Sequence, residues 1–347
     1  MKITRVPDGI GSDGQTLFAW HLENQNLKAV VSEYGVRLMA LRVRDKHHEW
    51  RNVILGLPSS QDYLQDTASL GAVVGRFANR VRESRYIDNR NSVLLNKNHG
   101  VHHLHGGEKG FEHVFWRAEA TPNGIRFNYT SADGEQGYPG ELRVAVTLSL
   151  FEQSLSYHYR ATTSRDTIIN LTNHAYFNLD GADTGEGDIT DHQLQIEADR
   201  YLPIDQDVLP TGEVVAVDST VFDFSQPAVI KERLQVADEQ LRLGLGFDHC
   251  FVLKQSSLKG GTSHALSQPV ASLYSPQTGI LLEIMTTEPG LQLYTGNYLP
   301  KPHAGLCLET QHFPDSPNMP HFPSTRLAAG AVFESTSIYR LTRKELV

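Results

Sequence analysis

Alternation of apolar and polar residues is the feature of this chain that most limits its fold. From residue 142 to residue 150, Leu and Val at even positions alternate with Arg, Ala, Thr and Ser at odd positions. Residues 155–160 repeat the alternation after a short connection at 151–154. Because successive side chains of a strand point to opposite faces of its sheet, each segment predicts a half-buried strand. The short connection between them predicts a hairpin.

Similar segments are distributed over the rest of the 347 residues. Further strands are predicted at residues 30–43, 125–129, 194–198 and 279–285. Helical patterns are short, and the best of them lie at residues 61–70 and 230–243. No internal repeat, low-complexity block or Pro/Gly/Ser linker marks a domain boundary in the sequence. We therefore predict an all-β fold, a large antiparallel β-sandwich that forms a single domain over residues 1–347.

Composition and charge exclude several classes of protein. Hydrophobic residues make up 39% of the chain and charged residues 20%, which excludes a disordered chain, a coiled coil and a collagen-like repeat. Acidic residues number 40 against 31 basic ones, so the formal net charge is −9. Such a chain repels a nucleic-acid backbone. The same charge weakly disfavours a phosphorylated substrate, although a local pair of arginines would override that effect.

Three absences indicate the compartment. The apolar runs are too short to cross a membrane, and the N-terminal residues lack the apolar stretch of a secretory signal. The two cysteines, Cys250 and Cys307, cannot build a disulfide framework. We expect a reduced, cytoplasmic enzyme with no nucleic-acid or membrane partner.

The first segment that could carry chemistry is Gly-Arg-Phe-Ala-Asn-Arg at residues 75–80. A guanidinium that faces a pocket offers a fixed fork of donors to an oxygen-rich ligand. The alternative, which composition alone favours, is a surface loop with Arg76 and Arg80 in solvent.

Histidines define the second segment, since five of the 16 in the chain lie between Asn98 and His113. The spacing of His102, His103 and His105 could suit a metal ion if the loop folds correctly. No cysteine and only one close carboxylate, Glu108, accompany them. Histidines that bind a ligand or simply satisfy a loop are therefore the more common outcome.

The third segment, residues 170–178, contains three Asn, one Thr, one His and one Tyr. If it is extended, His174, Tyr176 and Asn178 share one face. A neutral, amide-rich face with one titratable histidine suits a polyhydroxylated ligand, and His174 could act as an acid near neutral pH. The alternative is a satisfied core histidine in a polar strand.

In the fourth segment, Glu309 interrupts the apolar run Leu306, Cys307 and Leu308 near the end of a predicted strand. Apolar surroundings raise the pKa of a carboxyl group and make it a plausible general base. An ordinary glutamate that faces solvent is the alternative. Asp248 and Gln292, in two shorter stretches, add further polar groups.

Several rival chemistries lack their sequence signals. The chain has no Walker-type phosphate loop, no dinucleotide fingerprint after a strand and no Gly-x-Ser-x-Gly. It also lacks Cys-x-x-Cys and the zinc-protease motif His-Glu-x-x-His. One acid and one base, with amides suited to a sugar, remain.

Taken together, the segments resemble the aldose 1-epimerase family, the galactose mutarotases. Nine of them occur in the family's order: GAVVGRFANRV, HLHGG, GEQGYPGEL, NLTNHAYFNL, ADRYLPID, PTGEV, GFDH, LQLYTGN and LETQHFPDSPN. The resemblance implies a β-sandwich of the galactose mutarotase-like type. It also implies interconversion of the α and β anomers of free aldohexoses such as galactose and glucose, with no cofactor and no metal.

The resemblance also implies a role for individual residues. Glu309 matches the general base and His174 the general acid, while His105 matches a histidine near the ring oxygen of the sugar. The residues that match substrate-binding positions are Asn79, Arg80, Tyr176, Asp248 and Gln292. His102 and His103 exceed the family's usual need, so adventitious metal binding there stays open, as does the role of Glu288.

Three other functions stay open at this stage. A phosphosugar 1-epimerase on the same fold would need more basic residues than Arg76 and Arg80. A sugar-binding module without activity would have no reason to keep both Glu309 and His174. A metal-dependent enzyme would use His102, His103 and His105. The sequence leaves the preferred sugar undetermined and is compatible with a monomer or a weak dimer.

Overall fold

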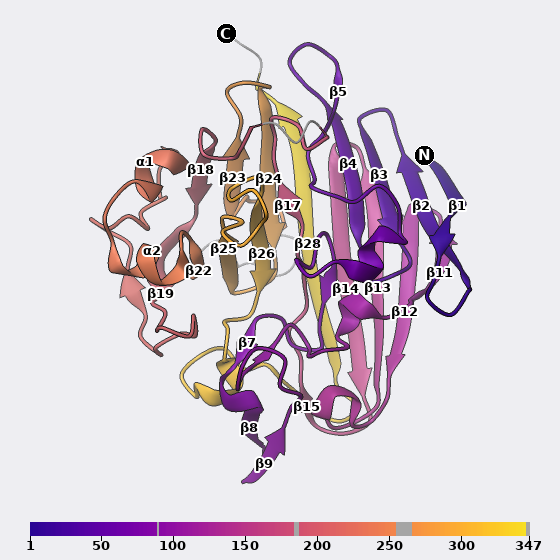
Figure 1. Ribbon diagram of the computed structural model, residues 1–347, viewed down its shortest axis with the longest axis vertical. Helices are drawn as coiled ribbons and strands as arrows, with labels where there is room; N and C mark the ends of the chain where they lie inside the picture. The colour runs from indigo at the N-terminus through magenta and orange to yellow at the C-terminus, as the bar shows by residue number, and fades with distance from the viewer. Residues whose placement is uncertain (89, 184–186, 255–265, 345–347) are drawn as a thin grey trace.

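Antiparallel strands form three large sheets in the computed structural model, which describes residues 1–88, 90–183, 187–254 and 266–344 (Figure 1). The largest sheet has nine strands. In spatial order they are β11 (Arg117–Thr121), β12 (Gly124–Ser131), β13 (Leu142–Phe151), β14 (Ser154–Thr163), β28 (Val332–Arg343), β24 (Ile280–Thr286), β23 (Ala271–Tyr274), β18 (Gln193–Ile196) and β21 (Ala228–Val229). Strand β28 occupies the middle of this sheet and pairs with both β14 and β24.

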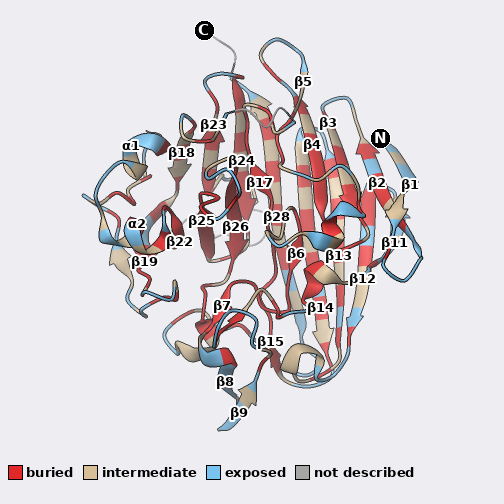
Figure 2. Ribbon diagram, in the orientation of Figure 1, coloured by how far each residue is buried: buried red, intermediate tan, exposed pale blue. Residues whose placement is uncertain are grey.

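A six-stranded sheet lies beside it and contains the most deeply buried strands. Its order is β17 (Tyr176–Phe177), β26 (Leu306–Gln311), β25 (Gly290–Tyr294), β22 (Asp248–Leu253), β19 (Ala198–Leu202) and β20 (Val215–Ala216). Figure 2 shows β25 and β26 buried along their lengths, whereas the edge strands β1 and β11 carry exposed residues. Strands buried on both faces have no free side for solvation, so each polar residue in them needs a partner or a ligand.

The N-terminal segment forms a third sheet of five strands in sequence order. They are β1 (Lys2–Ile10), β2 (Thr16–Glu23), β3 (Leu27–Ser32), β4 (Leu38–Arg44) and β5 (Trp50–Asn52). One cluster of buried apolar side chains joins all three sheets, since it includes Leu41 of β4, Leu148 of β13 and Leu308 of β26. The predicted sandwich of antiparallel sheets is therefore confirmed.

Short elements connect and cover the sheets. The two-stranded pairs are β6 (Val73–Val74) with β16 (Thr172–Asn173), β7 (Arg80–Val81) with β10 (His103–Leu104), β8 (Arg85–Asp88) with β9 (Asn91–Leu94), and β15 (Thr167–Ile168) with β27 (Arg326–Leu327). The helical turns are η1 (Asp62–Gln65), η2 (Arg82–Ser84), η3 (Phe111–His113), η4 (Glu135–Gly137), η5 (Ser316–Asn318), α1 (Ile230–Leu234) and α2 (Glu239–Gly244). Among the described residues, no helix is long and apolar enough to cross a membrane.

The predicted hairpin is present as β13 and β14, and the strands expected at 125–129 and 279–285 are β12 and β24. The strand expected at 30–43 is two strands, because Gly35 and Val36 adopt positive φ angles and turn the chain back. The strand expected at 194–198 is also divided, since β18 and β19 belong to different sheets.

Both expected helices are shorter than predicted. Only η1 forms within 61–70, because Asp66 is extended and its carboxylate accepts hydrogen bonds from the loop that follows. The segment 230–243 contains α1 and α2, and the Asp238 side chain caps the second helix.

The inward face of β24 provides a test of the period-two pattern. Leu282 is buried in the shared core, whereas its neighbour Leu281 lies half-buried on the opposite face. We expect Leu282→Ala to lower the free energy of unfolding by about 2–5 kcal/mol. The matched variant Leu281→Ala should lower it by less than about 1 kcal/mol. Urea unfolding followed by circular dichroism measures both, and equal losses would contradict this assignment of the two faces.

Candidate active site

Glu309 lies in the middle of β26 and is 2% exposed. Its Oε1 is 3.8 Å from Nε2 of His174, and its Oε2 has no hydrogen-bond partner among the described residues. Burial raises the pKa of this carboxyl well above its usual value, the charge of Asp248 adds to the increase, and Arg80 opposes it. The solvent-facing alternative for Glu309 is therefore wrong, and the predicted burial of this carboxyl is confirmed.

His174 lies between β16 and β17 and is 5% exposed. Its backbone N–H donates to Ala72 and its carbonyl accepts from Gly71. Burial lowers the pKa of the imidazole to about 4, below the ordinary histidine value that the sequence-based expectation used. The ring of Tyr176 lies 5.0 Å from that of His174, and the ring of His105 lies 5.3 Å away, edge-on.

The amides of residues 170–178 brace the backbone and do not form the ligand-facing surface that the sequence suggested. Asn170 donates to the carbonyls of Ala78 and His312, and Asn173 donates to that of Gly71. Asn178 donates to Ala304. Their density in the sequence reflects the many loop carbonyls that must be satisfied around a buried site.

A polar cluster faces Glu309 from the neighbouring strands. Cross-strand pairing places Gln292 of β25 directly opposite Glu309 and Cys250 of β22 opposite Gln292. Asp248 accepts from Gln292 Nε2 at 2.7 Å and pairs with Arg80 Nη2 at 3.3 Å. Arg80 Nε and Gln292 Oε1 are buried without a partner among the described residues. One donor and one acceptor are therefore available to a ligand.

Asn79 and His105 are held together by their backbones, and both have positive φ angles. The Asn79 N–H donates to His105 Nδ1 at 3.1 Å, so a neutral His105 carries its proton on Nε2. Burial lowers the pKa of His105 well below its usual value, with His174 and Arg80 adding to the effect. Asn79 Oδ1 accepts from the Arg80 N–H, which fixes the turn that presents the guanidinium.

The remaining candidates from the sequence serve the structure. Arg76 is buried and donates to Ser131 and to the carbonyls of Pro139 and Gly140, so it neither faces solvent nor contacts the other site residues. Both ring nitrogens of His103 are engaged, by Asn96 and Tyr138. The described residues therefore do not bring His102, His103 and His105 together as metal ligands.

His102 and Glu288 also have partners outside the site. His102 Nδ1 accepts from the N–H of Glu83, and its Nε2 lies 3.7 Å from Asp207. Glu288 is buried, and its carboxylate lies 2.6 Å from His312 Nδ1. Burial lowers the pKa of His312, but the charge and hydrogen bond of Glu288 outweigh it, and the net shift is upward.

A family model described as "Aldose 1-epimerase" matches residues 19–340. The chain is 39% identical over 344 residues to a galactose mutarotase from Sus scrofa, an alignment that covers 96% of this chain and 95% of that protein. It is 34% identical over 346 residues to an aldose 1-epimerase from Escherichia coli, covering 95% and 97%.

This chain belongs to the aldose 1-epimerase family. Solved structures agree with that membership. A galactose 1-epimerase from Lactobacillus acidophilus has a TM-score of 0.85 at 29% identity and covers 99% of both chains. An aldose epimerase homologue from Caenorhabditis elegans also has a TM-score of 0.85, at 28% identity, and covers 94% of this chain and 98% of the other.

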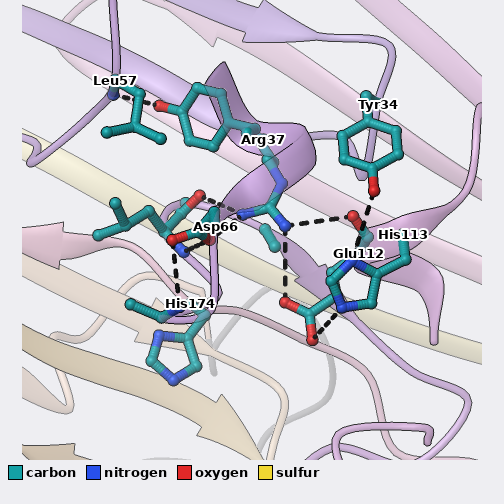
Figure 3. A network of polar contacts seen from close by, with 12 residues as sticks. Tyr34, Arg37, Leu57, Asp66, Glu112, His113 and His174 are labelled. Atoms are coloured by element: carbon teal, nitrogen blue, oxygen red, sulfur yellow. Dashed lines mark hydrogen bonds and ion pairs between the residues drawn. The ribbon is translucent and has the colours of Figure 1, made fainter. Parts of the chain in front are cut away.

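A buried ionic network supports the site of this epimerase-family chain, and sequence reasoning missed it (Figure 3). The Arg37 guanidinium is fully buried, lies 2.6 Å from the Asp66 carboxylate and donates to the carbonyl of Leu70. A second carboxylate, that of Glu112, lies 3.7 Å away. Arg37 stands between the apolar residues Val36 and Leu38, and that charged residue in an apolar run was the available signal.

The loop that Arg37 and Asp66 hold is in direct contact with the His174 segment. Asp66 also accepts from the N–H groups of Ala68 and Leu70. The Ala68 carbonyl in turn accepts from the Tyr176 hydroxyl at 2.9 Å. The N–H of Gly71, the residue after Leu70, donates to the backbone carbonyl of His174. The network therefore fixes the segments that carry both rings beside Glu309, those of His174 and Tyr176.

Removal of Arg37 should leave Asp66 and Glu112 as buried, uncompensated carboxylates. We expect Arg37→Met to lower the free energy of unfolding by about 3–5 kcal/mol. The control Arg143→Met removes an arginine whose side chain is 76% exposed beside Glu141 and should cause no measurable change. Chemical denaturation of both variants tests this, and equal stability of the two would show that the network contributes nothing.

Proposed function

We propose that this chain is an aldose 1-epimerase that interconverts the α and β anomers of free aldohexoses, with galactose and glucose as the expected substrates. The observation that carries the proposal is the buried pair of Glu309 and His174, with Oε1 and Nε2 3.8 Å apart. The family membership and the names of the relatives support the same reaction. We also infer one domain over residues 1–347, a monomer or weak dimer and a cytoplasmic location, which two buried free cysteines suit.

Anomer exchange requires one acid and one base. In ring opening, Glu309 as base takes the proton of the C1 hydroxyl, the bond between C1 and the ring oxygen breaks, and His174 as acid protonates that oxygen. Rotation about the C1–C2 bond presents the other face of the new aldehyde. Closure on that face returns both protons, with the two groups in exchanged roles. Positioned proton transfer supplies about 10²–10⁴-fold for each group.

The two groups must share a single proton for this cycle to work. Burial raises the pKa of Glu309 and lowers the pKa of His174 to about 4, so in the empty site the proton rests on Glu309. This form, with Glu309 protonated and His174 neutral, is the one present after ring opening and before closure. Ring opening starts from the other form, in which Glu309 is a carboxylate and His174 carries the proton on Nε2. The short distance between the two groups favours this pair of opposite charges.

The neighbouring polar groups would hold the sugar. Arg80 and Gln292 each have one buried polar atom without a partner among the described residues, and sugar hydroxyls would satisfy both. His105 would donate from Nε2 near the ring oxygen, beside His174, while Asn79 positions Arg80 and His105. Tyr176 would offer its ring, because its hydroxyl is already bonded to Ala68.

A phosphosugar substrate is the less favoured reading. Of the two arginines that a phosphate would need, Arg76 is bonded to Ser131 and to neighbouring carbonyls, and Arg80 is paired with Asp248. Because both guanidinium groups already have partners, a neutral sugar fits the site better than a sugar phosphate dianion does. The alternative of a binding module without activity leaves unexplained why an acid and a base are buried side by side.

Polarimetry of freshly dissolved α-D-galactose, with and without the protein and EDTA, tests the proposal directly. We expect faster relaxation that ignores EDTA. Glu309→Gln and His174→Asn should each lose at least about 10²-fold in kcat/KM, because each removes one of the two proton-transfer groups.

Matched controls separate loss of chemistry from loss of folding. The circular dichroism spectra of the two variants should match that of the wild type, and Glu288→Gln should keep most activity because Glu288 pairs with His312 outside the site. A Glu309 or His174 variant that retains more than about a tenth of the activity would count against its proposed role. No acceleration with galactose or glucose would overturn the proposal.

The pH dependence follows from the directions of the two pKa shifts. Below about pH 4, His174 gains a proton while Glu309 is still protonated, and no base remains. When the pH rises through the raised pKa of Glu309, that group loses its proton while His174 is neutral, and no acid remains. We therefore expect kcat/KM to stay flat from about pH 5 up to the raised pKa of Glu309, after subtraction of the spontaneous rate.

An NMR titration of the His174 ring should likewise show a neutral imidazole over that range. The exposed His47, in the turn before β5, is the control in the same spectra. A His174 ring that titrates near the ordinary histidine pKa of about 6.5 would contradict the assignment.

A further inference from the structure

We propose that the same site also binds a thiophilic divalent cation of the Zn²⁺ or Cd²⁺ class, held by Cys307, His174 and Glu309, and that this cation inhibits the enzyme. One ligand atom from each of the three side chains lies within 4.8 Å of the other two, and all three residues are buried. Only the inhibition rests on the proposed function; the binding does not.

Cys307 and Glu309 are two residues apart on β26, so they project from the same face of the strand. The sulfur of Cys307 lies 3.4 Å from His174 Nδ1. Tetrahedral zinc, with bonds of about 2.3 Å to sulfur and about 2.0 Å to nitrogen, places two such ligands about 3.5 Å apart. The cysteine and histidine therefore already stand at the spacing of one edge of a zinc site.

The carboxylate supplies the third ligand. Glu309 now faces the other ring nitrogen, Nε2, through its Oε1, while its Oε2 is buried without a partner among the described residues. Because no hydrogen bond ties Oε2 down, a small rotation of the carboxylate can bring it to a cation beside Nδ1. The fourth position is left to water or to a sugar hydroxyl.

Charge and softness select the class of ion. A thiolate and a carboxylate neutralise a divalent cation in a buried space, whereas sulfur and imidazole are poor ligands for Mg²⁺ or Ca²⁺. Binding displaces the thiol proton of Cys307 and the proton of Glu309, and both leave to solvent. Burial raises the pKa of both groups, so binding should tighten as the pH rises.

The cation would occupy both proton-transfer groups at once. His174 and Glu309 could then neither donate nor accept a proton, and the sugar would compete with the ion for the space. Inhibition should be competitive with galactose and fully reversed by EDTA. EDTA would also remove a loosely held surface ion, but inhibition by such an ion would not be competitive with galactose.

Ultraviolet titration of the wild-type protein with Cd²⁺ tests the site without any reference to activity. We expect a sulfur-to-cadmium charge-transfer band that saturates at one ion, since the band requires a thiolate ligand. It should be absent from Cys307→Ala and present in Cys250→Ala, which removes the other buried thiol, from β22. If Cys307→Ala does not fold, Cys307→Ser replaces it, because a hydroxyl gives no such band.

Polarimetry at several Zn²⁺ concentrations gives the second readout. Cys307→Ala should raise the inhibition constant at least tenfold relative to its own uninhibited rate, whereas Cys250→Ala should leave the constant near the wild-type value. No band in the wild type, a band that persists in Cys307→Ala, or equal inhibition by Mg²⁺ would overturn the proposal. A wild type that binds Cd²⁺ but does not accelerate mutarotation would refute the proposed function alone.

Discussion

The burial of Glu309 inside a strand without exposed residues is the constraint on which the rest of the site depends. A carboxyl group in that position cannot be solvated, so it stays protonated in the empty site or must share its proton with a neighbour. His174 is the neighbour within reach, and burial keeps it neutral by the same effect. One desolvated space thus supplies an acid and a base, and among the described residues neither group has an ion-pair partner other than the other one.

Keeping such a space in shape requires support from outside it. Arg37 and Asp66 hold one loop, and Arg76 holds a second by donating to the carbonyls of that loop. Asn170 joins the segment before Asn79 to the residues after Glu309. These groups are buried polar residues whose partners are mostly backbone atoms. Backbone atoms give a rigid frame, because a carbonyl cannot change rotamer. The chemistry is carried by a few side chains, and the polar residues around them fix where those side chains lie.

The sequence predicts those elements of the fold that a local pattern determines, and it does not predict those that depend on tertiary contacts. Period-two alternation predicted β13 and β14. The position of Glu309 in an apolar run predicted a buried carboxyl. The turn at Gly35 and the crossing between β18 and β19 were missed, because an alternating pattern does not show where a chain turns back or passes to another sheet. Asn178 was placed on a ligand-facing surface, and Arg76 was expected either in a pocket or in solvent, since composition does not say whether an amide or guanidinium meets a sugar or a carbonyl. Arg37 was missed because its partners lie distant in the sequence.

The place of β28 in the nine-stranded sheet has a consequence for how the protein is made. This strand follows every other described strand in the chain, yet it pairs with β14 and β24 on either side. Until β28 leaves the ribosome, each of those two strands has one unpaired edge, and the shared core lacks Tyr339 and Leu341. Contacts such as Ser154 with Arg340 also join residues separated by more than half of the chain, and such long-range pairing slows folding. The nascent protein therefore depends on β28 to cover these two strand edges, and its need for chaperones should persist until β28 has been synthesised.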